Sequence, residues 1–148
     1  MKWVTRRNAG VDRLACAWLI RRFIDPECEI LFVPGEYVAR VAEKEEAVPF
    51  DVPDVEFTHH DGKCTFETMV SHYKIQDVAL ERLALIVHAA DIAGELDSMA
   101  EGPGLLAFAN GLQKTTDDDN RKTLIAYPLF DALHKHCQTV IDNEIEGT

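Results

Sequence analysis

The first 33 residues place a helical pattern between two strand-like segments, and this order limits the folds open to the chain. Residues 2–6 (KWVTR) and 29–33 (EILFV) are rich in β-branched and aromatic side chains, which suit strands. Residues 11–25 between them space apolar side chains as an amphipathic helix does, and Pro26 ends the pattern. A strand, a helix and a strand of these lengths predict a βαβ unit with parallel strands and a right-handed crossover.

Most of the remaining sequence has a helical pattern. Helices are expected at residues 36–47, 64–73, 77–95, 102–112 and about 121–143. Thr65 and Asp77 are expected to be N-caps, and Pro128 to kink or split the last helix. A third strand is expected at residues 55–59, after a loop at 49–54. The pattern predicts an α+β, predominantly helical fold with a small sheet of about three strands, in one domain spanning 1–148.

The distribution of charge limits which classes of molecule the protein is expected to bind. The net charge of −11 argues against a general nucleic-acid binder, which would carry a basic face. Residues 1–22 are the exception, because they hold six basic side chains and one acidic one, a net charge of +5. A cationic segment on an acidic protein is a reasonable place for a small anion.

The cysteines and the apolar runs indicate a cytoplasmic protein. None of the four cysteines forms a CxxC pair, so the simplest expectation is a reduced chain. The apolar run at 14–20 is too short to span a bilayer. Asp12 and Arg13 precede it, which is unlike a signal peptide.

Residues 59–67 (HHDGKCTFE) bring several metal-ligand side chains to the start of a helix. His88 and Asp91 lie three apart on the helix at 77–95, so they share a face, and a short loop lets this helix lie beside the one at 64–73. Imidazole and carboxylate ligands suit zinc, iron or manganese, and a thiolate would favour zinc. We therefore predict one divalent ion bound by ligands from the set His59, His60, Cys64, Glu67, His88 and Asp91.

Helix capping and ordinary packing could also account for these residues. A glutamate in a first helical turn, such as Glu67, is favoured by the helix dipole alone. His88 could be a hydrogen-bonded, half-buried histidine, and Cys64 a small apolar filler. Alternatively, a thiol beside a helix N-terminus and two histidines would have a lowered pKa and react readily. The spacing leaves a metal site, a reactive thiol and a purely structural role open.

Residues 5–13 (TRRNAGVDR) form a second candidate site. A strand leading through a glycine-containing turn into a helix is an arrangement that binds oxyanions. Arg13 falls in the first helical turn, where the dipole disfavours a cation, so a negative partner is expected. Either Asp12 is that partner, or an oxyanion is held by Arg6 or Arg7, Arg13 and the helix N-terminus. The chain has no GxGxxG or Walker glycine pattern, so a nucleotide is not indicated.

Several longer motifs together resemble the chromate-resistance family defined by the C-terminal domain of ChrB proteins. They are WVTR (3–6), VDRLACAWLIRRFIDPE (11–27), PFD (49–51), CTFE (64–67) and LERLALIVHAAD (80–91), with weaker likeness at 104–112 and 127–133. The matching positions are Trp3, Arg6, Asp12, Arg13, Trp18, Arg22, Phe23, Asp25, His59, Cys64, Phe66, Glu67 and Asp91. The resemblance implies a cytoplasmic bacterial protein tied to chromate stress. Some members carry an N-terminal extension and are linked to chromate-responsive control of an efflux transporter, and this chain is expected to hold only the shared domain.

The resemblance favours a binding domain that recognises a metal ion, an oxyanion such as chromate, or both, in a sensing or regulatory role. The alternative is a small metal-dependent oxidoreductase or hydrolase, and a third interpretation is a helical interaction module without chemistry. A closed four-ligand metal site would favour sensing, whereas a metal with open positions would favour an enzyme. Nucleic acid and membrane are not expected as partners, and a homodimer stays open.

Overall fold

A computed structural model describes residues 1–147, in which a small parallel sheet is covered by helices. Strand β1 (Lys2–Arg6) lies between β2 (Glu29–Val33) and β3 (Val48–Pro49) and is parallel to both. Helix α1 (Val11–Leu19), which continues as a π-helical turn at Ile20–Ile24, connects β1 to β2. The predicted βαβ unit is therefore confirmed.

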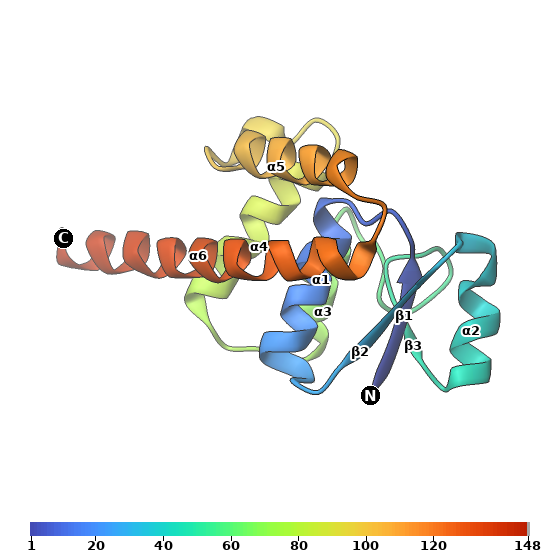
Figure 1. Cartoon of the computed structure of the whole chain (residues 1–148). Helices are drawn as coiled ribbons and strands as arrows, with labels where there is room; N and C mark the ends of the chain where they lie inside the picture. Colours follow the sequence, from blue (N-terminus) through green and yellow to red (C-terminus); the bar gives the residue numbers. More distant parts are fainter. Residues whose placement is uncertain (148) are drawn as a thin grey trace.

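The rest of the chain is mostly helical, which confirms the predicted fold class. The further helices are α2 (Val38–Glu45), α3 (Thr65–His72), α4 (Val78–Asp91), α5 (Gly102–Thr115) and α6 (Asp119–Glu146), with short 3-10 turns at Gly35–Tyr37 and Leu96–Ser98. Figure 1 shows α2 on one side of the sheet and the other helices on the opposite side, with α6 projecting away from the sheet to the C-terminus.

The side-chain alternation along β1 explains why helices cover both faces of the sheet. Trp3 packs into the main core with Trp18 of α1, whereas Val4 packs with Val38 of α2 in a smaller cluster. Each of these four side chains is at most 2% exposed. Successive residues of a strand point to opposite faces, so one short strand supports both layers.

Helix α6 is a single helix of 28 residues, so of the two predicted effects of Pro128, a kink or a split, the split is wrong. A proline in a helix removes the hydrogen bond to the carbonyl four residues earlier, here that of Leu124. Leu124 is 68% exposed, so water can bind the freed carbonyl.

The third strand lies at Val48–Pro49 and not at residues 55–59 as predicted. The segment after it cannot continue a ladder, because Asp51, Asp54 and Asp61 have left-handed backbone conformations. Phe57 makes only an isolated bridge to Phe50 and packs against Trp3. Asp51 consequently comes directly after the sheet.

The helix ends also differ in part from the predictions. Asp77 caps α4 as predicted, with its Oδ1 accepting from the Leu80 amide at 2.9 Å. The N-cap of α3 is Cys64, and Thr65 is the first helical residue. Helix α4 ends at Asp91, four residues before the predicted end, and Gly94 follows with a positive φ of 86°.

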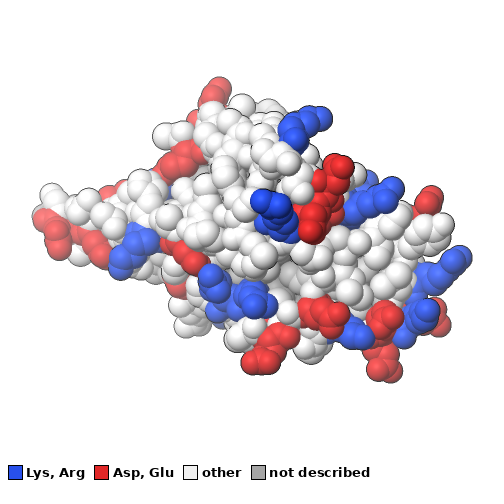
Figure 2. All heavy atoms as spheres, viewed as in Figure 1, with Lys and Arg blue, Asp and Glu red and all other residues white. Residues whose placement is uncertain are grey.

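The surface carries both signs of charge. Figure 2 shows acidic and basic side chains interspersed on the face in view. Among residues 1–147, no helix combines the length and the apolar character that crossing a membrane requires.

Candidate functional site

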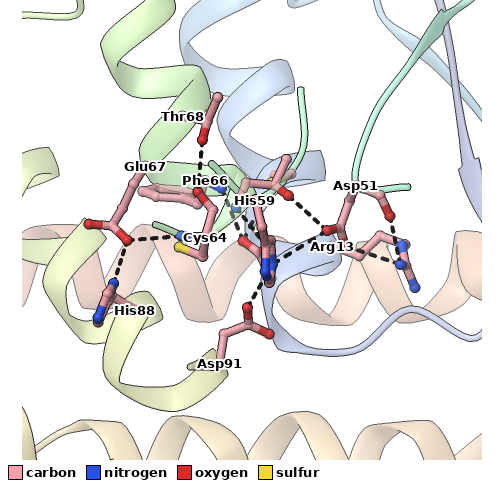
Figure 3. Close-up of polar contacts among 12 residues, drawn as sticks. Arg13, Asp51, His59, Cys64, Phe66, Glu67, Thr68, His88 and Asp91 are labelled. Atoms are coloured by element: carbon pink, nitrogen blue, oxygen red, sulfur yellow. Dashed lines mark hydrogen bonds and ion pairs between the residues drawn. The ribbon is translucent and has the colours of Figure 1, made fainter. Parts of the chain in front are cut away.

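Polar side chains meet at the carboxyl end of the parallel strands, the edge where open α/β sheets usually bind ligands. Asp12 lies in the first turn of α1 after β1, and Asp51 follows β3. His59 comes from the loop before α3, and Asp91 is the last residue of α4. Figure 3 shows His59 between Asp91 and Asp51.

Asp12 is a buried carboxylate that caps a helix other than its own. Its Oδ2 accepts from the Thr65 amide at 2.9 Å, and its Oδ1 accepts from the Phe66 amide at 3.0 Å. These are the first two amides of α3, where the helix dipole favours a negative charge. The residue is 3% exposed. Asp12 therefore joins α1 to α3 and has a fixed orientation.

His59 lies near three carboxylates through one ring nitrogen, two of them close and the third, Asp51 Oδ1, at 3.8 Å. Its Nε2 lies 3.1 Å from Asp12 Oδ2 and 3.1 Å from Asp91 Oδ2. The contact with Asp91 lacks hydrogen-bond geometry, so the buried Asp91 Oδ2 has no hydrogen-bond partner within residues 1–147. We call Asp12, His59 and Asp91 the Asp–His–Asp cluster.

The cluster holds an excess of negative charge. The hydrogen bond to Asp12, with the charges of Asp12 and Asp91, raises the pKa of His59 to about 9. Burial, followed by repulsion from Asp12, raises the pKa of Asp91 to about 6. Both shifts mean that His59 and Asp91 retain their protons more tightly than the free side chains do. This is expected where carboxylates are close together and partly buried.

Arg13 is paired with Asp51, a partner that was not among the two left open from the sequence, Asp12 and an oxyanion. An Arg13 guanidinium nitrogen lies 3.1 Å from Asp51 Oδ2 and donates to the Asp51 carbonyl at 3.0 Å. The Thr65 hydroxyl donates to Asp51 Oδ1 at 2.8 Å. This pair fixes the loop after β3 against α1, so Arg13 is already neutralised by the protein.

The predicted anion-binding residues Arg6, Arg7 and Arg13 line different hollows: Arg6 and Arg7 share one, and Arg6 and Arg13 share two others. The amides of Asn8 and Ala9, just before α1, donate to the Asp119 carboxylate at 3.0 and 2.9 Å. An internal carboxylate thus occupies the two amides that precede the N-cap of α1, Gly10. Arg6 and Arg7 are exposed, and their side chains have no ion-pair partner within residues 1–147.

The predicted metal ligands separate into two groups. His59 and Asp91 join the Asp–His–Asp cluster. Glu67 forms a capping contact with the Cys64 amide at 3.1 Å and pairs with His88 Nδ1. His60 is turned to the Glu56 carbonyl, 2.7 Å from its Nε2. Figure 3 shows the Glu67–His88 pair on the other side of Cys64 from His59.

Cys64 has the environment of a packing residue. Its side chain is buried, and burial, followed by repulsion from Asp12, raises the pKa of its thiol well above the usual value. A reactive thiol would require a lowered pKa. The helix N-terminus alone therefore does not activate this cysteine.

We expect Cys64 in the folded protein to be alkylated slowly at neutral pH, whether or not a chelator is present. The reason is that the thiol is buried and protonated and lies outside the Asp–His–Asp cluster. Mass-spectrometric quantification of iodoacetamide labelling checks this. Rapid labelling of the native protein, or a sharp increase upon chelation, would contradict it.

Two adjoining hollows open onto the cluster. One of about 610 Å³ is lined by residues that include Arg6, His59 and Asp91. A smaller one of about 210 Å³ is lined by residues that include Arg6, Asp12 and Asp91. Solvent and small ions can therefore reach the cluster from the strand ends.

The donor atoms of the cluster have the spacing of metal ligands. Three ligand atoms, one each from Asp12, His59 and Asp91, lie within 4.8 Å of one another. Two ligands about 2.1 Å from one ion are separated by about 3.0–3.4 Å, so His59 Nε2 and each carboxylate oxygen, at 3.1 Å, fit that spacing. An ion with two carboxylates and one imidazole would keep open coordination positions.

Sequence reasoning missed Asp12 and Asp51 as members of the site. Both follow strands of the sheet, so the rule that ligands bind at the carboxyl ends of parallel strands could have found them. Placing the third strand at 55–59 instead of 48–49 hid Asp51. From the sequence, Asp12 was considered only as a possible partner of Arg13, whereas in the structure it caps α3.

Comparison with known proteins gives a family match over most of the chain. The sequence model described as "ChrB, C-terminal domain" matches residues 3–137. Protein ChrB of Cupriavidus metallidurans is 35% identical over 137 residues, which is 91% of this chain and 40% of that protein. The chain thus spans less than half the length of this curated relative. No solved structure was found to match it.

Proposed function

The chain belongs to the family defined by the C-terminal domain of ChrB, and from this premise we propose that it binds a divalent cation in chromate resistance, in a sensing or regulatory role. Family membership supports the chromate-resistance role. The observation that supports the cation is that His59 Nε2 lies 3.1 Å from both Asp12 Oδ2 and Asp91 Oδ2, in a group whose ligand atoms lie within 4.8 Å of one another.

The three ligands would contribute in different ways. Asp12 is held by two α3 amides, so it offers a preoriented oxygen. Asp91 offers a buried oxygen that lacks a hydrogen-bond partner within residues 1–147, and a cation would supply its missing positive charge. His59 would bind through Nε2 once its proton leaves. Without a thiolate, this set suits manganese or iron at least as well as zinc.

The positions of the proposed ligands support a sensing role. They come from the start of α1, the loop before α3 and the end of α4, so one cation would join three segments that are distant in sequence. Without the cation, a protonated His59 lies between the Asp12 and Asp91 carboxylates, which raise its pKa to about 9. A divalent cation would replace that proton and stabilise the arrangement in which all three segments meet, because a ligand stabilises the state that it binds best.

The open coordination positions favour a second candidate, a small metal-dependent oxidoreductase or hydrolase. Two of the three protein ligands, His59 and Asp91, line a hollow of about 610 Å³, which leaves room for a reacting molecule on the metal. The two candidates differ in turnover. An enzyme would convert a substrate catalytically and stop when the cation is chelated, whereas a sensing domain would show saturable binding and no turnover.

Cation affinity is expected to rise with pH, which tests the proposed ligands. A cation must displace the proton from His59, whose pKa is about 9, and from Asp91, whose pKa is about 6. Affinity should therefore increase up to about tenfold per pH unit between pH about 6.5 and about 8.5, mainly through His59. Titration with Mn²⁺ across this range measures the slope. An affinity that does not change with pH would exclude His59 as a ligand.

A further inference from the structure

Arg6 is a cation without a counter-charge beside the proposed metal site. It is the last residue of β1 and is exposed, and its side chain has no hydrogen-bond or ion-pair partner within residues 1–147. It lines the hollow of about 610 Å³ together with His59 and Asp91. It also lines the hollow of about 210 Å³ with Asp12 and Asp91. Arg6 and the cluster therefore share one solvent-filled space.

Gly35 leaves room for Arg6 to lie at this position. A β-carbon at Gly35 would stand 3.0 Å from Arg6 Cδ and 3.5 Å from Cγ. The first distance is shorter than an ordinary van der Waals contact, so any larger residue would press on the arginine side chain. Gly35 lines the larger hollow as well. The turn after β2 thus supports the aliphatic part of Arg6 at the rim of the hollow.

The charges favour an anion only after a cation has bound. Arg13 is neutralised by Asp51. A divalent cation would neutralise the carboxylates of Asp12 and Asp91, leaving Arg6 as the uncompensated charge that faces the hollow. Without the cation, the same two carboxylates repel an anion. The smaller hollow, about 210 Å³, has room for a tetrahedral oxyanion with several waters, each of which needs roughly 30 Å³.

We propose that the site holds a small tetrahedral oxyanion between the bound cation and the Arg6 guanidinium, so that anion binding requires the cation. The inference rests on the proposed function, because the cation supplies the second contact. It differs from an anion site built on the basic N-terminal segment as a whole, in which Arg7 would contribute as much as Arg6. The guanidinium suits this ligand because it donates two parallel hydrogen bonds to an oxyanion.

Calorimetric titration with sulfate, a redox-inert tetrahedral dianion, tests the proposal, with chromate as a second probe. Sulfate should bind the Mn²⁺-loaded protein about tenfold more tightly than the chelated protein. Arg6→Ala should weaken sulfate binding to the loaded protein by about tenfold. Gly35→Ala should weaken it in the same direction although the charge is kept, because it displaces the Arg6 stem.

Arg7→Ala is the matched control, since Arg7 adjoins Arg6 and is exposed but does not line the two hollows on the cluster. It should change sulfate affinity by less than about threefold. Equal sulfate binding with and without Mn²⁺, or Arg6→Ala binding sulfate as the unchanged chain does, would overturn the inference. Mn²⁺ affinity is measured separately for each variant. If one of these two results is found while Mn²⁺ binding is intact, only the oxyanion proposal is refuted. If the unchanged chain binds no cation, the proposed function is refuted as well.

Discussion

Asp12→Ala is expected to lower the free energy of unfolding by about 3–5 kcal/mol, the largest effect of any single change at the site. The variant removes a buried carboxylate that accepts hydrogen bonds from the Thr65 and Phe66 amides and pairs with His59. The two α3 amides would then be buried without an acceptor, and α1 would lose its polar link to α3. Urea unfolding of the chelated protein measures the loss.

Asp91→Asn is the matched control, and it should not lower the free energy of unfolding as Asp12→Ala does. Asp91 is also a carboxylate of the cluster, but burial and Asp12 raise its pKa to about 6, so its charge costs stability above that pH. Its folded pKa lies above the unfolded value of 3.8, so the stability that it contributes when protonated is lost as pH rises through about 6. Asparagine removes this cost, and the chelated variant should be as stable as the unchanged chain or more so near neutral pH. Equal losses in both variants would contradict the assigned roles.

His59→Ala is expected to weaken divalent-cation binding by about 100-fold or more, because loss of a direct ligand should cost at least as much as loss of an outer partner. Its Nε2 is the one ring nitrogen in the Asp–His–Asp cluster. Titration with Mn²⁺ or Zn²⁺ above neutral pH measures the change.

His88→Ala is the control for this comparison. From the sequence, His88 was a predicted ligand, but in the structure it pairs with Glu67 outside the cluster. The variant should keep its cation affinity within about tenfold, since His88 is at most an outer partner. If His88→Ala abolishes binding and His59→Ala does not, the cation belongs to the Glu67–His88 group.

Local patterns predicted the fold well because the elements are specified by nearby residues. The apolar spacing of residues 11–25 and the two flanking strands predicted the βαβ unit, and the structure has it. The third strand was wrong because Val48–Pro49 is short and is defined by pairing with Trp3 and Val4, a contact that the local pattern does not encode. The β-rich residues 55–59 form a loop, because Asp54 and Asp61 on either side adopt positive φ.

The site was less predictable because helix spacing does not specify which neighbour a side chain meets. His88 and Asp91 share a face of α4, yet His88 contacts Glu67 whereas Asp91, one turn later, contacts His59. The choice between His59 and His60 depends on the turn at Asp61 and Gly62, which have left-handed backbone. Asp12 enters the site through α3, more than fifty positions away in sequence.

Counting the divalent metal per chain tests the central claim most directly. The protein is purified without chelators from cells given Mn²⁺, iron and Zn²⁺, and its metal content is measured by elemental analysis beside that of Asp91→Asn. Convergence of Asp12, His59 and Asp91 predicts about one divalent metal per unchanged chain and close to none in the variant. A chain that carries no metal and takes up none on addition, or an Asp91→Asn variant that keeps a full complement, would contradict the account.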